Sequence, residues 1–133
     1  MKFDHAQLLW SRHPRVFEKD KIYPYVGVGW FELLDNLCGQ IEEELEDGEA
    51  FAVTQIKQKF GGLRFYVYPC PDRIYDMIHE AERQSWHICE VCGAQAVTIN
   101  DQGGITWRTR CEEHKDLYSC EDSMASIGGY FKK

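Results

Sequence analysis

Four soft metal ligands stand out in the sequence because they come in two short pairs. Cys89 and Cys92 are separated by two residues, as are Cys111 and His114, and eighteen residues lie between the pairs. Each pair can supply two ligands from one tight turn, and the intervening segment is long enough to fold back and bring the pairs together. The pattern predicts one zinc ion held by three thiolates and one imidazole.

The composition of this ligand set also predicts what the zinc does. Four protein ligands fill a tetrahedral ion and leave no position for substrate water, which favours a structural site over a catalytic one. Two neighbours compete for the fourth position, namely His87 and Cys120. A redox pair at Cys89 and Cys92 is a further alternative, but such a pair needs a preceding strand and a long helix after it. The sequence predicts a helix before this motif and a hairpin after it.

The residues around the ligands predict a small zinc module. Gly93 directly follows Cys92, where a knuckle turn often needs a residue with positive φ. Residues 97–99 and 105–109 favour two strands, with turn residues between them. The module should therefore begin with a knuckle and continue as a hairpin.

The second ligand pair should follow on a helix. Cys111 and His114 are three residues apart, so both can lie on its first turn. The order of knuckle, hairpin and helix over residues 89–119 resembles the treble-clef class of zinc finger. Some members of that class are HNH nucleases, but the predicted hairpin has no histidine for a second metal, so we do not expect nuclease activity.

The elements before the ligands predict the body that must position this module. Apolar residues recur at three- and four-residue steps from Trp30 to about Asp47, and again from Asp72, a good N-cap, to about Trp86. Strand-forming segments between these helices indicate a hairpin, and they cover residues 51–58 and 63–68. We expect an α+β fold, with two amphipathic helices around a β-hairpin and a C-terminal treble-clef-like zinc module. The expected parts are an α+β body over 1–88 and a zinc module over 89–133, packed on the body as one compact unit.

The turn of the body hairpin is a candidate site for a partner or an anion. Three cations surround a diglycine turn, and the group comprises Lys57, Lys59, Gly61, Gly62 and Arg64. Amides of an exposed turn can face an anion, and interleaved aromatics suit stacking on bases. The alternative is a tight turn flanked by a solvated strand face.

The end of the first predicted helix is strongly acidic. A candidate docking face for a protein comprises Glu42, Glu43, Glu46 and Asp47. The alternative is a solvated helix face. The chain has a formal net charge of −7, which disfavours general nucleic-acid binding because phosphate contacts need cations. A protein partner is therefore the first expectation. The alternative is a nucleic-acid or nucleotide binder, which would use Lys57, Lys59, Arg64, Arg108 and Arg110.

Three motifs resemble those of a family of small uncharacterised phage and bacterial proteins. They are Gly-Trp-Phe at 29–31, the segment Gln-Ile-Lys-Gln-Lys-Phe-Gly-Gly-Leu-Arg-Phe-Tyr at 55–66, and the downstream Cys-x-x-Cys-Gly. The resemblance implies a phage or prophage origin but no activity. Small acidic phage proteins often bind a host protein and inhibit or redirect it, so we expect a non-enzymatic host-interaction or anti-defence role.

The remaining composition favours a cytoplasmic protein of a bacterium or an infected host cell. The sequence shows no secretory signal and no run of about 20 apolar residues that could span a membrane. Six cysteines without such a signal indicate metal ligands and thiols instead of disulfides. Cys38, Cys70 and Cys120 are expected to be small thiols. The remaining histidines are scattered, and we find no catalytic constellation.

Overall fold

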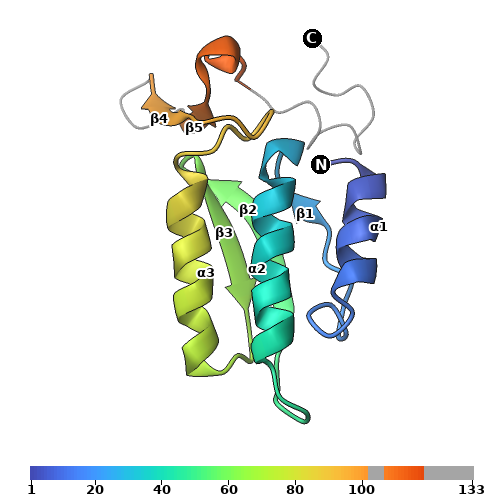
Figure 1. Cartoon of the computed structure of the whole chain (residues 1–133). Helices are drawn as coiled ribbons and strands as arrows, with labels where there is room; N and C mark the ends of the chain where they lie inside the picture. The colour runs from blue at the N-terminus through green and yellow to red at the C-terminus, as the bar shows by residue number, and fades with distance from the viewer. Residues whose placement is uncertain (102–106, 119–133) are drawn as a thin grey trace.

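The computed structural model describes residues 1–101 and 107–118 and shows a mixed α+β fold (Figure 1). Three α-helices belong to the body, and they are α1 (Phe3–Arg12), α2 (Phe31–Glu44) and α3 (Asp72–Ser85). The body sheet has three strands, which are β1 (Pro24–Tyr25), β2 (Val53–Lys59) and β3 (Gly62–Val67). The module adds β4 (Val97–Asn100) and β5 (Trp107–Arg110), and the 3-10 turns are η1 (Val28–Trp30) and η2 (Glu112–His114). The predicted α+β fold class is confirmed.

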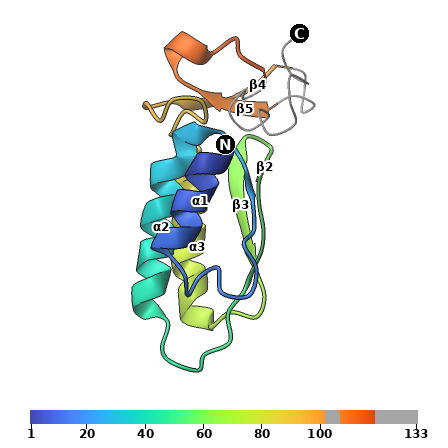
Figure 2. The ribbon, with the colours of Figure 1, turned by 90° about the vertical axis from the view of Figure 1, so that its right-hand side faces the viewer.

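The body has two layers, with the helices on one face of the sheet (Figure 2). The strand order is β1-β2-β3; β1 runs parallel to β2, and β2 and β3 form the expected antiparallel hairpin. Ile56 pairs with Phe65, and both side chains are buried under the helices. Neighbouring residues in a strand point to opposite faces. The residues next to Ile56 on β2 and next to Phe65 on β3 therefore project to the uncovered face.

The helices bury the apolar stripes that the sequence predicts. On α2 the buried residues are Leu33, Leu34, Leu37, Cys38 and Ile41, and on α3 they are Ile74, Ile78, Ala81 and Ser85. Trp30, at the end of η1, is fully buried in the same cluster. Each fully buried Leu or Ile contributes about 1.5–3 kcal/mol of transfer free energy. This apolar core holds the two layers together.

Two predicted helix boundaries differ from those in the structure. Helix α2 ends at Glu44 instead of near Asp47, and Leu45 is already extended, with ψ 132°. The Arg73 guanidinium donates to the Glu44 carbonyl at 2.8 Å, which satisfies a group left free at the helix end. Asp72 is the first helical residue of α3 instead of its N-cap, which is Pro71 and makes no side-chain capping hydrogen bond.

Candidate metal centre

The structure brings together the four residues that the spacing singled out. The ligand atoms of Cys89, Cys92, Cys111 and His114 all lie within 4.8 Å of one another. The Sγ atoms of Cys92 and Cys111 are 3.7 Å apart, and His114 Nδ1 lies 3.8 Å from Cys89 Sγ and 3.2 Å from Cys111 Sγ. Bonds of about 2.3 Å to sulfur and 2.0 Å to nitrogen place tetrahedral ligands about 3.6–3.8 Å apart. The cluster can hold a metal ion, and its geometry suits zinc.

A knuckle after α3 presents the first two ligands. The Gly93 amide donates to the Cys89 carbonyl at 2.8 Å, and the Cys89 amide donates to the Ala94 carbonyl at 2.8 Å. Gly93 has φ +86°, a left-handed conformation that glycine adopts without steric cost. The expected knuckle is therefore present.

The second pair lies on a shorter element than predicted. Cys111 precedes η2, a single 3-10 turn that ends with His114, so no α-helix follows within the described residues. Arg108 Nε donates to the Lys115 carbonyl at 2.8 Å, and Arg110 Nε donates to the Leu117 carbonyl at 2.7 Å. These side chains occupy carbonyl groups that a continuing α-helix would use for its own hydrogen bonds.

The surroundings of the Cys89 thiol favour its thiolate form, which is the form that binds a metal cation. Burial raises the pKa of Cys89, but amides of Cys111, Cys92 and Val91 and the His114 ring outweigh it and lower that pKa to about 7. Burial and the neighbouring thiols raise the pKa of Cys92 to about 11. Metal binding therefore has to release protons from thiols, as at other thiolate sites.

The alternative ligands do not join the cluster. Among the described residues, the group contains only the four predicted members. His87 is exposed and lines a separate cavity beside Arg64 and Trp86. Cys120 lies outside the described residues. Cys38 is buried in the body core, and burial raises its pKa and that of Cys70, the latter to about 11.

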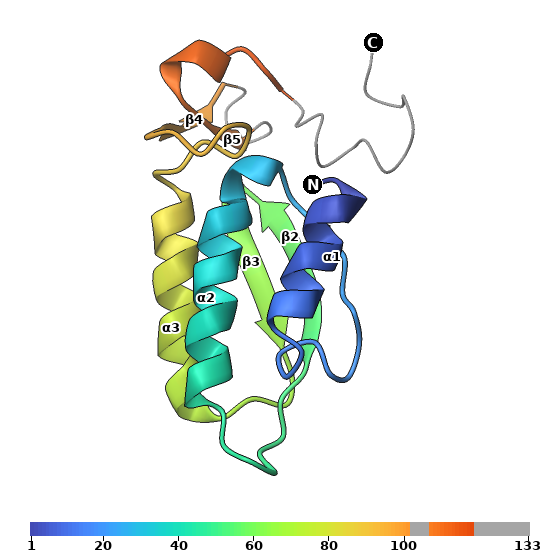
Figure 3. The ribbon, with the colours of Figure 1, turned by 45° about the vertical axis from the view of Figure 1, so that its right-hand side comes forward.

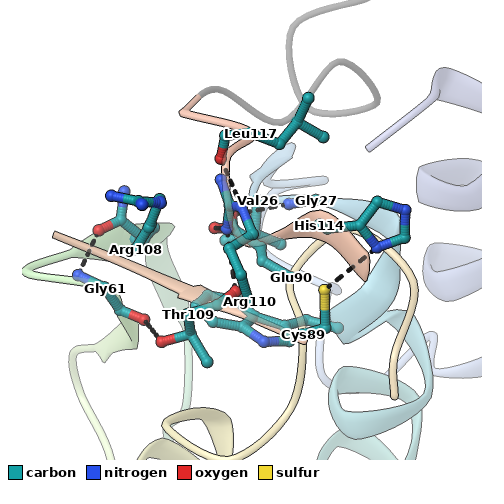
Figure 4. A network of polar contacts seen from close by, with 12 residues as sticks. Val26, Gly27, Gly61, Cys89, Glu90, Arg108, Thr109, Arg110, His114 and Leu117 are labelled. Carbon is teal, nitrogen blue, oxygen red and sulfur yellow. Dashed lines mark hydrogen bonds and ion pairs between the residues drawn. The ribbon is translucent and has the colours of Figure 1, made fainter. Parts of the chain in front are cut away.

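A buried polar network joins the metal cluster to the body (Figure 4). Glu90, between the first two ligands, is only 5% exposed and accepts a hydrogen bond from the Gly27 amide at 2.9 Å. Its carboxylate lies 3.6 Å from Arg110 Nη1. Burial raises the pKa of Glu90, and the Gly27 amide and Arg110 oppose that rise. The acid is thus held from both sides, by the Gly27 amide of the body and by Arg110 of β5.

The backbone of the knuckle also packs directly on the body. The Gly29 amide donates to the Glu90 carbonyl at 2.8 Å, and Trp30 Nε1 donates to the Ile88 carbonyl at 2.8 Å. A Cβ atom on Gly29 would lie 2.1 Å from the Cys89 carbonyl oxygen, so only glycine fits there. Chain segments about sixty residues apart in sequence meet at this point.

The diglycine turn is a contact between body and module, which contradicts the prediction of an exposed turn. Gly61 and Gly62 are buried, and the Gly61 carbonyl accepts a hydrogen bond from Thr109 Oγ1 at 2.6 Å. The Gly61 amide, expected to face an anion, donates to Gln58 Oε1 at 2.5 Å. A Cβ atom on Gly62 would lie 1.7 Å from Trp86 Nε1. The two glycines therefore permit close packing instead of forming an anion site.

The five cations of the nucleic-acid hypothesis fall into two groups. Arg108 and Arg110 are 4% and 3% exposed and form ion pairs, with Asp101 at 2.7 Å and Glu90 at 3.6 Å respectively. Their guanidinium groups stabilise the module and do not offer charge to solvent. The members of the second group are Lys57, Lys59 and Arg64, on the strands of the body hairpin.

The predicted acidic face lies at the other end of the molecule from β4 and β5 (Figure 3). Glu42 is partly buried, because its carboxylate accepts hydrogen bonds from the amides of Arg15 and Val16 at 3.2 and 2.8 Å. Glu43, Glu46 and Asp47 are exposed. Glu42 thus stabilises the turn after α1, and the other three remain accessible.

No family model, curated protein or solved structure matches the chain. None of the described helices combines the length and apolar character needed to cross a bilayer. The phage-family resemblance accordingly stays a prediction, and the functional argument depends on the metal cluster and the surfaces around it.

Proposed function

We propose that the protein binds one structural zinc ion and acts, without catalysis of its own, by binding a macromolecular partner. The observation that carries this proposal is the closed set of three sulfurs and one imidazole nitrogen within 4.8 Å. Four such ligands satisfy zinc and leave no position for a reacting water. The ion would hold the knuckle and β5 in the arrangement that packs on Gly29 and Gly61.

A bacterial cytoplasm is the compartment we propose. Zinc requires all three cysteines as thiolates, and a reducing compartment keeps them from forming disulfides. The resemblance to phage proteins supports a host protein as partner, with inhibition or redirection of a defence function as its consequence. For such a partner, the docking residues that remain exposed are Glu43, Glu46 and Asp47.

Metal content tests the first half of the proposal. Native mass spectrometry should find one zinc ion per chain, and the double variant Cys89→Ser/Cys92→Ser should bind none. The matched control is Cys70→Ser, which removes a partly exposed thiol outside the cluster and should leave one zinc bound. A full zinc equivalent in the double variant would refute the assignment.

Partner recovery tests the second half. The zinc-loaded chain, immobilised and exposed to an extract of the bacterium that encodes it, should retain one macromolecule at a fixed stoichiometry. Replacement of Glu43, Glu46 and Asp47 by glutamine should reduce recovery of a protein partner that uses the acidic residues. A chain that retains no macromolecule, or one that turns over a substrate in a zinc-dependent assay, would contradict the proposal.

A further inference from the structure

The uncovered face of the body sheet carries a row of aromatic and cationic side chains. Tyr25 pairs with Lys57, and Lys57 pairs with Arg64, so one residue from each strand projects side by side on this face. Tyr66 lies in the next row, and Lys57 Nζ is 5.8 Å from the centre of its ring. Tyr25 and Tyr66 are 57% and 39% exposed. No described helix covers this side of the sheet (Figure 2).

Charge is strongly segregated on this face. The chain has a net charge of −7, yet β1, β2 and β3 contain no aspartate or glutamate. Among the residues that the structure describes, the ion pairs include none from Lys57, Lys59 or Arg64. Like charges directly opposite each other, as at Lys57 and Arg64, destabilise a sheet. Their placement is therefore better explained by an anionic ligand than by stability of the fold.

Arg64 gives a second, independent indication of a ligand. Its Nε atom is buried and has no hydrogen-bond partner, although buried donors are nearly always satisfied. The side chain lines a cavity of about 440 Å³ together with Glu82, Arg83, Trp86 and His87. An acceptor oxygen bound beside Arg64 would satisfy this donor. Arg83 is paired with Glu80, so it is Arg64 that extends the cationic row of the open face to the edge of β3.

The edge of β3 is closed to an added peptide strand. The amides of Leu63 and Phe65 donate to Ser85 Oγ at 2.9 Å and to Glu82 Oε2 at 3.0 Å, so α3 already occupies the groups that a peptide would need. A ligand of this region must therefore lie across the face of the sheet. That face offers exposed tyrosines and cations. A ligand made of flat groups joined by anionic groups would stack on the tyrosines and pair with the cations.

We propose that this face binds single-stranded nucleic acid, an inference that rests on the proposed binding of a macromolecule and adds nucleic acid to the protein partner proposed there. Bases stack on Tyr25 and Tyr66, while phosphates lie against Lys57, Lys59 and Arg64. Stacking platforms bordered by cations bind single strands with little sequence preference, because every base has a flat face. The acidic remainder of the molecule keeps affinity modest and sensitive to salt.

Fluorescence anisotropy with labelled twelve-nucleotide oligo-dT and oligo-U tests this inference on the zinc-loaded full chain. Binding should weaken as salt rises, with a logarithmic slope of about −2 for three phosphate contacts. Tyr66→Ala should weaken binding about tenfold or more through lost stacking, and Lys57→Gln should reduce the salt slope. The matched controls are Tyr75→Ala on α3 and Lys19→Gln before β1, and both should bind as the parent chain does.

The readouts separate this inference from the function on which it rests. Each variant is first checked for one bound zinc and an unchanged melting temperature, so that loss of folding is not mistaken for loss of binding. No oligonucleotide binding at low salt, or binding that Tyr66→Ala leaves unchanged, would overturn the inference. Equal binding of a polyglutamate peptide would also overturn it, because the face would then be a general surface for acidic proteins. Stoichiometric recovery of a protein without oligonucleotide binding would overturn the inference and leave the proposed function standing.

Discussion

The body and the zinc module reach stability by different physical means. The body buries a continuous apolar cluster of nineteen described residues, whereas the module's own cluster contains Cys89, Ala96 and Cys111. Two of those three are metal ligands. Since burial of apolar area is the main favourable term in folding, the body can support itself. The small cluster of the module leads us to expect that a metal ion takes the place of a core.

The contact between the two regions follows from this difference. It consists largely of directed polar bonds, such as Gly27 to Glu90 and Thr109 to Gly61, and of glycines that allow close approach. A buried acid is costly unless it is paired and hydrogen-bonded. We therefore expect the module to dock only when it is correctly assembled, so that the proposed metal would be a condition of the contact as well as of the module.

Removal of zinc should have the largest effect and should separate the two regions. Structural zinc sites contribute on the order of 10 kcal/mol or more, so a chelator or Cys89→Ser/Cys92→Ser should unfold the described parts of the module, residues 88–101 and 107–118. Hydrogen exchange should show lost protection there and retained protection in α2, β2, β3 and α3. Simultaneous loss of protection in α2 and α3 would show that the body depends on the metal too.

Truncation of the body core should give the next largest effect, in the other region. Leu34 is fully buried on α2, and Leu34→Ala should lower the free energy of unfolding by about 2–5 kcal/mol. Native mass spectrometry below the melting temperature should still find one zinc. Leu8→Ala is the matched control, because Leu8 is 40% exposed and exposed substitutions usually change stability by about 0.5 kcal/mol or less. Loss of zinc from folded Leu34→Ala would contradict the separation.

A methyl group at the contact should weaken both regions moderately. The Cβ atom of Gly29→Ala would lie 2.1 Å from the Cys89 carbonyl oxygen, so the knuckle must move, at a cost of about 1–3 kcal/mol. Chemical denaturation would measure the loss in free energy of unfolding, and competition with a chelator would measure the loss in zinc affinity. In the control Gly39→Ala, the new Cβ is 3.7 Å from His13 Cε1, and removal of a mid-helix glycine should stabilise α2 by about 0.5–1 kcal/mol. Equal effects of both variants would show that the Gly29 contact is not tight.

The smallest effect should be confined to the far end of the body. A hydrogen bond from Arg73 lowers the pKa of Glu49 from 4.5 to about 2. Because the folded pKa is the lower one, this pair stabilises the fold above pH 4.5, and the contribution is lost as the pH falls towards 2. NMR titration of the Glu49 carboxyl should show a return towards 4.5 in Arg73→Gln. An unchanged Glu49 titration would contradict the pairing.

The metal cluster could be predicted from the sequence because its information is local. Two residues between the ligands of each pair fix a tight turn, and the ligand types fix the preferred ion. The stripes of α2 and α3 were predictable for the same reason, since a helix repeats its contacts every three or four residues. By contrast, the predicted end of α2 was wrong, because the helix ends at Glu44, whose carbonyl accepts a hydrogen bond from Arg73, 29 residues away.

The exposure of individual residues could not be predicted in the same way. Glu90 looks like a polar knuckle residue, and its burial depends on Gly27, 63 residues earlier. Gly61 looks like the tip of a solvated turn, and its burial depends on Thr109, 48 residues later. Strand β1 has only two residues, which is too short for an alternating pattern, and its partner β2 lies beyond α2 in the sequence. A Gly-x-Gly at 27–29 that faces a Cys-Glu-x-Cys is the one sequence signal that could have suggested this contact.

The position of the ligands in the chain has a consequence for biosynthesis. A ribosome delivers the residues of the body cluster, from Met1 to Ala81, before it delivers the first ligand, Cys89. Domains generally fold as units in the order of their synthesis, so the body can collapse while the module is still unmade. The last ligand, His114, then emerges beside a finished docking surface. Binding of a metal ion at the cluster would therefore follow collapse of the body, and a chain that stops short of His114 would leave Gly29 and Gly61 without their contacts to the module.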